Sequence, residues 1–132
     1  MAAPSMLRRI LEVIRRRRLN AHALATFRKF PLWKGELEPG FLIDFIGQRI
    51  STSFYTRAPR QVSLPTYPLN SEETFEWLGL LEAVLQSGDT FTMIEAGAGY
   101  GRWSVAAVRA LRSLGRQTKT HFVAIEAEPT HF

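Results

Sequence analysis

The residues with the clearest chemical potential lie in one short stretch, IEAGAGYGRW, from Ile94 to Trp103. It places the carboxylate of Glu95 directly before three closely spaced glycines, Gly97, Gly99 and Gly101. Glycine tolerates backbone conformations that side chains forbid, so such a run is typical of a tight turn that brings bare backbone close to a ligand. This turn and its acid are therefore the first candidates for a functional site.

The spacing of the glycines argues against the two common phosphate-binding motifs. The dinucleotide fingerprint G-x-G-x-x-G requires glycine or alanine where this chain has Arg102, and no G-K-[ST] sequence of a P-loop follows. A phosphate turn offers N–H groups at a helix N-terminus to an anion, and Glu95 would bring a negative charge close to that anion. A ligand with an ammonium and a sulfonium group would instead favour this carboxylate, and S-adenosylmethionine is such a ligand.

A second acid, Glu126, ends another apolar run 31 positions after Glu95 (126 − 95). A carboxylate at the end of a strand accepts two hydrogen bonds from the cis hydroxyls of a ribose. A glycine triplet alone is also explained by a turn that needs glycine for its own backbone. The two acids, the flanking strands and the intervening helix together favour ligand binding over that purely structural explanation.

The segments around the glycines predict the elements that position them. TFTMIEAG is a short apolar run rich in strand-forming residues, and RWSVAAVRALRSLG repeats apolar residues at helical spacing, with Gly115 as its C-cap. A second strand is expected from His121 to Ile125, before Pro129. Strand, turn, helix and strand form one right-handed βαβ unit, whose ligand end lies at the carboxyl ends of the strands.

FTMIEAGAGYGRW followed by FVAIEAEPTHF resembles the cofactor half of class I S-adenosylmethionine-dependent methyltransferases, in particular the FkbM-type family. The resemblance runs from about Tyr67 to Phe132 and implies an α/β, Rossmann-like fold of which the first βαβ unit is present. It also implies O-methylation of a hydroxyl on a sugar or natural product. Family members typically have asparagine in place of Gly99 and often aspartate in place of Glu95.

The resemblance assigns roles to the residues of the turn and to the second acid. It implies that the methionine end of the cofactor lies against the turn, that Glu126 holds the ribose and that Ala127 lies near the adenine. The implied cofactor-binding residues are Glu95, Ala96, Gly97, Ala98, Gly99, Tyr100, Gly101, Glu126 and Ala127.

No catalytic base and no metal site can be assigned from the sequence. His22 lies in the basic N-terminal segment, His121 opens a strand as an expected edge residue, and His131 follows the second acid without a visible acceptor pocket. Tyr100 and Trp103 either shape the methionine end or pack beside the turn. The acceptor is expected to be a small molecule or a glycan.

Residues 35–69 predict a β-hairpin and a proline-rich linker. Strands are expected at Phe41 to Ile46 and Arg49 to Tyr55, with Gly47 at the turn between them. RAPRQVSLPTYPLN then contains three prolines and indicates an extended segment. A helix is expected from Glu72 to Gln86 with Gly88 as its stop, and Asn70 with Glu73 forms the pattern of a capping box.

Residues 1–34 form a basic amphipathic segment that holds 9 of the 17 basic residues and only one acid, Glu12. Apolar residues recur at positions 7, 10, 11 and 14, and Arg15 to Arg18 follow at once. One interpretation is an arm that binds a membrane surface or nucleic acid. We favour a solvated helix that docks its apolar stripe on the domain, with the arginines near its C-terminal end, where the helix dipole stabilises them. Because the rest of the chain carries 8 basic and 11 acidic residues, no nucleic-acid groove is expected.

Length and composition bound the remaining possibilities. The 132 residues, 45% of them hydrophobic, fit one folded domain, of which residues 70–132 are expected to be the N-terminal part of a methyltransferase domain. The absence of cysteine fits the cytoplasm, and no apolar stretch is long enough for a transmembrane helix.

Only six residues follow Glu126, so we expect a portion of a longer enzyme or a truncated gene product. The alternative is a non-catalytic nucleotide-binding or interaction module recruited by its basic helix.

Overall fold

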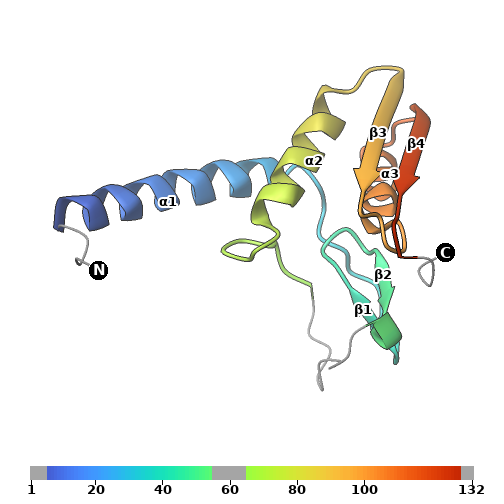
Figure 1. Cartoon of the computed structure of the whole chain (residues 1–132), viewed down its shortest axis with the longest axis horizontal. Helices are drawn as coiled ribbons and strands as arrows, with labels where there is room; N and C mark the ends of the chain where they lie inside the picture. The colour runs from blue at the N-terminus through green and yellow to red at the C-terminus, as the bar shows by residue number, and fades with distance from the viewer. Residues whose placement is uncertain (1–5, 55–64, 129–132) are drawn as a thin grey trace.

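The computed structural model describes residues 6–54 and 65–128, with the side chains of residues 7–11 left out (Figure 1). Helices alternate with small sheets, so the chain is an α/β protein. The elements in chain order are α1 (Met6–Phe27), β1 (Phe41–Ile43), β2 (Arg49–Ser51), the short 3-10 helix η1 (Thr52–Phe54), α2 (Thr74–Gln86), β3 (Thr90–Ala96), α3 (Arg102–Ser113) and β4 (Lys119–Ile125).

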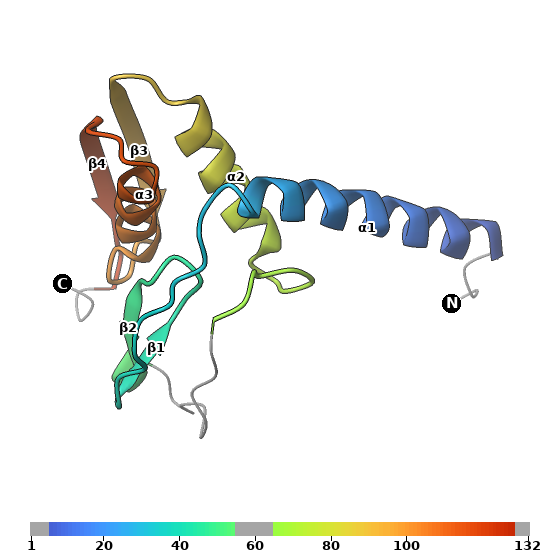
Figure 2. The same ribbon diagram turned by 180° about the vertical axis from the view of Figure 1, so that it is seen from behind.

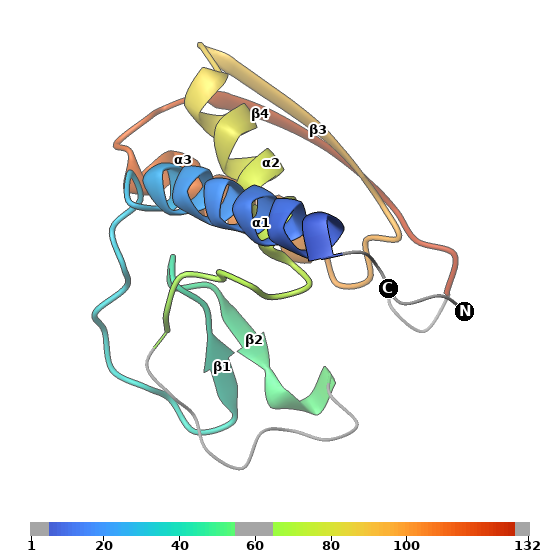
Figure 3. The same ribbon diagram turned by 90° about the vertical axis from the view of Figure 1, so that its left-hand side faces the viewer.

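The predicted strand, helix and strand are confirmed as β3, α3 and β4. The two strands pair in parallel, with Ile94 beside Val123 in the register. Helix α3 lies against one face of this two-stranded sheet, the face that buries Phe91 (Figure 3). On the opposite face Ile94, Val123 and Ile125 are exposed. Strand β4 begins two residues earlier than expected, because the Lys119 N–H still bonds to the Asp89 carbonyl at 2.8 Å.

The predicted hairpin is also confirmed, but its strands are shorter than expected. Strand β1 ends at Ile43 because the Asp44 side chain turns the chain back by accepting the N–H groups of Ile46 at 3.2 Å and Gln48 at 2.8 Å. Gly47 lies in this turn with a φ of 81°. Beyond β2 the chain enters η1 instead of continuing as a strand, and Tyr55 lies outside the described residues.

The predicted capping box of α2 is wrong. The helix begins at Thr74, Glu73 is its N-cap and makes no side-chain cap bond, and the Asn70 side chain accepts a hydrogen bond from Asn20 at 2.7 Å. Thr74 closes the turn instead, because its hydroxyl accepts the Ser71 N–H at 3.1 Å. At the other end the helix stops at Gln86 as expected, but Ser87 in an extended conformation ends it, and Gly88 has no positive φ.

The predicted C-cap of α3 is confirmed. Gly115 has a φ of 68°, and the Arg116 N–H bonds back to the Leu111 carbonyl at 3.2 Å, as in the Schellman arrangement. The Arg116 guanidinium then reaches the end of α2 and donates to the Val84 carbonyl at 2.8 Å. One arginine therefore joins the C-terminal ends of two helices, where cations are favoured.

One hydrophobic core contains residues from α1, the hairpin, α2, β3 and α3. Phe45 of the hairpin loop packs its ring 5.8 Å from Phe27 of α1 and 4.8 Å from Trp77 of α2. The buried residues of this core are Ala23, Phe27, Phe30, Phe45, Ile46, Trp77, Leu78, Leu80, Leu81, Val84, Phe91, Ala106, Ala107, Ala110 and Leu111. The core fixes α2 and the hairpin around the end of the sheet that carries the glycine turn.

Helix α1 docks differently from the prediction. Its C-terminal part contacts α2 through buried Ala23 and Phe27, whereas Ile14 of the apolar stripe is 44% exposed. The arginines at 15–18 lie in mid-helix, and the last turn holds no basic residue. The expectation that the arginines lie at the helix end is therefore wrong. Of the expected stripe, only Ile14 has a described side chain, and it is not docked; the side chains of the other members, at positions 7, 10 and 11, lie outside the described residues. Among the described residues, none of the helices is both long and apolar enough to cross a membrane.

Candidate functional site

The glycine turn links the carboxyl end of β3 to the first residue of α3. Gly97, Gly99 and Gly101 have φ values of 71°, 52° and 71°, in the left-handed region that other L residues rarely adopt. A Cβ atom at any of the three would meet nothing within 4 Å. The need for glycine here comes from the backbone conformation and not from crowding.

Most N–H groups of the turn are used within the protein. The Ile125 carbonyl, at the end of β4, accepts the N–H of Gly97 at 2.8 Å and that of Ala98 at 3.0 Å. The Gly99 N–H donates to Glu126 at 2.6 Å, and the Gly101 N–H donates to the Ala98 carbonyl at 2.8 Å. These four donors therefore do not face outward as a phosphate cradle would require.

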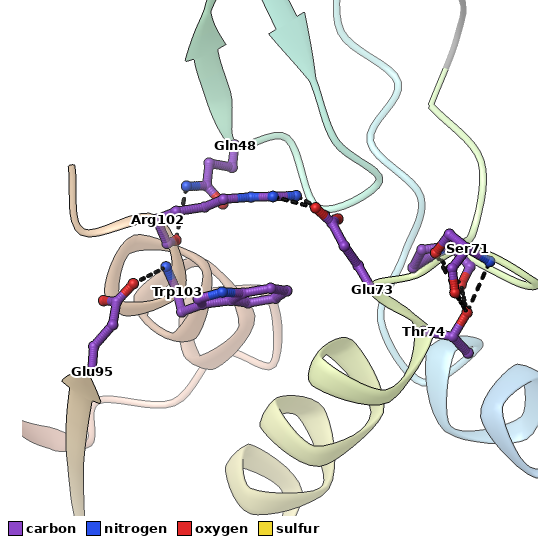
Figure 4. A network of polar contacts seen from close by, with 8 residues as sticks. Gln48, Ser71, Glu73, Thr74, Glu95, Arg102 and Trp103 are labelled. Carbon is purple, nitrogen blue, oxygen red and sulfur yellow. Dashed lines mark hydrogen bonds and ion pairs between the residues drawn. The ribbon is translucent and has the colours of Figure 1, made fainter. Parts of the chain in front are cut away.

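Glu95 is 5% exposed and faces the N-terminus of α3. One oxygen accepts the N–H group of Trp103 at 3.0 Å (Figure 4). The other accepts the N–H group of Ser104 at 3.0 Å and the Ser104 hydroxyl at 2.6 Å. The carboxylate thus takes the position that an anion would occupy at this helix end and satisfies two N–H groups that have no partner within the helix. The sequence predicted ligand contact for Glu95, and the structure adds this capping role.

Glu126 lies one residue beyond β4, with its carboxylate directed to the turn. One oxygen accepts the Gly99 N–H at 2.6 Å and the other accepts the Glu128 N–H at 2.8 Å. Both carboxylate oxygens therefore have partners within the protein. Ala127 follows as an exposed residue, Ala96 ends β3 on its exposed face, and Ala98 is buried within the turn.

A cavity of about 410 Å³ lies between the hairpin and the glycine turn, within the common range of roughly 300–1,000 Å³ for small-molecule sites. Glu126 is not among its lining residues, so it contacts the turn from the β4 side. The cavity is lined by Gln48, Arg49, Ile50, Phe54, Glu95, Gly97, Ala98, Gly99, Tyr100, Arg102, Trp103 and Val105. The hairpin residues among them were not predicted, because no sequence pattern places the hairpin beside the turn.

The two aromatic residues of the turn region pack in different ways. The Tyr100 ring stacks on Phe54 of η1, with centroids 3.8 Å apart and planes at 14°. Trp103 is half-buried and meets Trp77 edge to face, with centroids 5.1 Å apart. Tyr100 therefore closes the cavity on the hairpin side, while Trp103 joins its wall to the core.

A polar network fastens the start of α3 to the hairpin and to α2 (Figure 4). The Gln48 side chain, 4% exposed, donates to the Arg102 carbonyl at 2.9 Å. The Arg102 guanidinium forms a two-pronged ion pair with Glu73, one prong of which is the contact from Nη2 to Oε2 at 2.6 Å. Glu73, expected to cap its own helix, thus holds the neighbouring helix instead.

Asp44 is the titratable group near the site with a clear shift. Its burial raises the pKa from 3.8 to about 6, although the N–H groups of Gln48 and Ile46 and the charges of Arg102 and Arg109 act in the opposite direction. The Oδ2 atom is buried without a hydrogen-bond partner. Asp44 is therefore a charge whose burial is only partly compensated.

The histidines do not converge on this site. His22 of α1 contacts Glu82 of α2 at 2.6 Å, and His121 is an exposed residue inside β4, not its first residue. His131 lies outside the described residues. In the described ranges, no group of three His, Asp or Glu side chains is arranged to hold a metal ion.

No protein-family model matches the chain, and the comparisons with curated proteins and with solved structures give no significant match. The interpretation of the site therefore depends on its geometry and on the sequence resemblance.

Proposed function

We propose that the chain is the cofactor-binding half of a class I, Rossmann-like S-adenosylmethionine-dependent methyltransferase. The observation that carries the proposal is the position of Glu126, whose carboxylate lies 2.6 Å from the Gly99 N–H at the carboxyl end of two parallel strands. This end of a parallel sheet is where α/β proteins bind their ligands. The acceptor that we propose is a hydroxyl of a sugar or natural product, in the cytoplasm.

The charge of the site supports a ligand with a cationic portion. Glu95 and Glu126 approach the turn from its two sides, and four of the turn's N–H groups are already used. An anion would meet two carboxylates and few available donors, whereas an ammonium or sulfonium group would be attracted to both acids. A carboxylate at the end of a parallel strand is also the type of group that holds ribose hydroxyls.

In this proposal the chain binds and orients the cofactor. Glu126 holds the ribose, and Ala127 leaves room beside it for the adenine. The turn from Ala96 to Gly101 supports the methionine end, with Tyr100 above it. Bound S-adenosylmethionine supplies an electrophilic methyl group, and the transfer requires mainly an acceptor oxygen held in line with it. No residue of the chain is assigned as the base.

The experiment is isothermal titration calorimetry of the full chain with S-adenosylmethionine and S-adenosylhomocysteine. Neutral adenosine and anionic ATP are titrated in the same way for comparison. We expect both sulfur compounds to bind, with ATP excluded by the carboxylates. Glu126→Ala should weaken binding more than tenfold, since hydrogen bonds to a charged group contribute about 1.5–3 kcal/mol. Glu36→Ala, which removes an exposed glutamate that does not line the cavity beside the turn, is the matched control.

Three outcomes would contradict the proposal. Tighter binding of ATP than of S-adenosylmethionine would favour the alternative, a non-catalytic nucleotide-binding module. Equal affinity of the Glu126→Ala and Glu36→Ala variants for S-adenosylmethionine would exclude the proposed contact between Glu126 and the ribose. No heat with either sulfur compound would leave the glycine turn as a structural feature only.

A further inference from the structure

Helix α1 reaches well beyond the folded body of the protein (Figures 1 and 2). Its C-terminal part is anchored by Ala23 and Phe27, both 0% exposed. Every residue from 12 to 18 is exposed. The helix therefore presents an arm, residues 12–18, that the body does not cover.

The apolar side of this arm faces away from the body. Ile14 lies nine residues before Ala23 (23 − 14), and at about 100° per residue this spacing places the two on opposite sides of the helix. Ile14 is 44% exposed. Its neighbour Val13 is 52% exposed and lies about 100° from Ile14 around the helix, between that side and the docked side. Since Ala23 marks the docked side, rotation of the helix cannot bring Ile14 to the core without removing Ala23 and Phe27 from it.

Positive charge borders the same apolar side. Arg17 and Arg18 stand three and four residues after Ile14, the spacings at which side chains on a helix are neighbours. Both are exposed, and the whole of α1 contains six arginines and the single acid Glu12. Arginines beside an exposed aliphatic side chain suit a helix at the surface of a lipid bilayer, because their apolar stems extend along the aliphatic group while their guanidinium groups reach the head groups.

We propose that the arm binds an anionic lipid surface, with Ile14 and Val13 at the boundary of the acyl chains and Arg17 and Arg18 among the head groups. Charge complementarity selects this occupant, because each arginine near an anionic bilayer contributes favourably while the aliphatic side chains leave water. Nucleic acid would satisfy the arginines alone and leave Ile14 and Val13 exposed. The inference does not depend on the proposed cofactor.

The experiment is flotation of the full chain with vesicles of phosphatidylcholine alone or mixed with phosphatidylserine. We expect binding only to the mixed vesicles. Arg17→Gln with Arg18→Gln should weaken it roughly tenfold or more, since each arginine contributes on the order of 1 kcal/mol. Arg28→Gln with Lys29→Gln, which removes the same charge at exposed positions beyond the helix, should have a smaller effect.

The apolar contribution needs its own pair of variants. Ile14→Gln should weaken binding to the mixed vesicles several-fold, whereas Phe75→Gln, at a 64% exposed position of α2, should not. Circular dichroism checks that the helix content of each variant is unchanged. Equal loss in the two charge pairs, or no effect of Ile14→Gln, would overturn the proposal. Binding to duplex DNA that survives Ile14→Gln, without vesicle binding, would assign the arm to nucleic acid.

Discussion

The Glu126 carboxylate accepts the N–H of Gly99 at 2.6 Å and so joins the end of β4 to the turn that follows β3. The Ile125 carbonyl reinforces this connection through the N–H groups of Gly97 and Ala98. The two ends of the βαβ unit therefore form one hydrogen-bonded edge. A ligand that moves the turn must therefore break hydrogen bonds to groups at the end of β4.

Glu95→Ala should destabilise the fold by about 2–3 kcal/mol, because it leaves the N–H groups of Trp103 and Ser104 and the Ser104 hydroxyl without their acceptor. Glu95→Gln keeps one acceptor oxygen and should cost about half as much. Urea denaturation measures both free energies of unfolding. Two equal losses below about 0.5 kcal/mol would show that the cap contributes little.

Gly101→Ala should cost about 1 kcal/mol or more, because its φ of 71° is unfavourable for any side chain. Gly79→Ala is the matched control, since Gly79 lies inside α2 with open space around it. There the substitution should stabilise the protein by roughly 0.5–1 kcal/mol through helix propensity. Thermal unfolding of the two variants should shift in opposite directions, and a shared sign would contradict the assigned backbone geometry.

Asp44→Asn should stabilise the protein at neutral pH. The folded pKa of Asp44, about 6, is above its ordinary value of 3.8, so the folded state binds the extra proton more tightly. The stability that this proton provides is complete below pH 3.8 and is lost as the pH rises through 6. Asparagine carries no charge and retains the oxygen that accepts the Ile46 and Gln48 N–H groups.

Urea denaturation at pH 4 and pH 7.5 tests this expectation. The variant and the unsubstituted chain should differ little at pH 4, and the variant should be more stable at pH 7.5 by up to about 3 kcal/mol. Asp89→Asn, at an exposed position, is the control and should show no such pH dependence. A variant that is less stable than the original chain at pH 7.5 would contradict the buried charge.

The ion pair between Arg102 and Glu73 should contribute about 0.5–1 kcal/mol of coupling energy, because both side chains are about one-third exposed and water screens their attraction. The measurement is a double-mutant cycle with Arg102→Gln and Glu73→Gln, read from free energies of unfolding. The pair His22 and Glu82, which is more exposed, provides a comparison cycle and should give a smaller value. Additive single and double variants would mean that α2 and α3 are joined by packing alone.

The sequence predicted the elements better than it predicted the partners of their polar groups. Short apolar runs rich in strand-forming residues predicted β3 and β4, helical spacing predicted α3, and Gly115 ended this helix as expected. Asn70 and Glu73 had the spacing of a capping box, but Asn20 and Arg102, both distant in sequence, compete for their side chains. Local patterns contain no information on such long-range partners.

The direction of α1 could not be predicted for a related reason. Helical periodicity shows that Ile14 belongs to an apolar stripe, but it does not show which side of the helix the core covers. Burial of Ala23 and Phe27 determines that side, and it is the side opposite Ile14. The cavity could not be predicted either, because its wall at Gln48 and Phe54 of the hairpin arises from tertiary packing.

The stacking of Tyr100 on Phe54 has a mechanical consequence. Tyr100 lies between Gly99 and Gly101, two residues whose backbone is intrinsically unrestricted. Its ring is nevertheless held by stacking on Phe54 of η1. Any movement of this loop must either carry the hairpin with it or separate the two rings. The glycine turn and the hairpin are therefore mechanically coupled, so that a ligand that displaces Tyr100 also displaces Phe54.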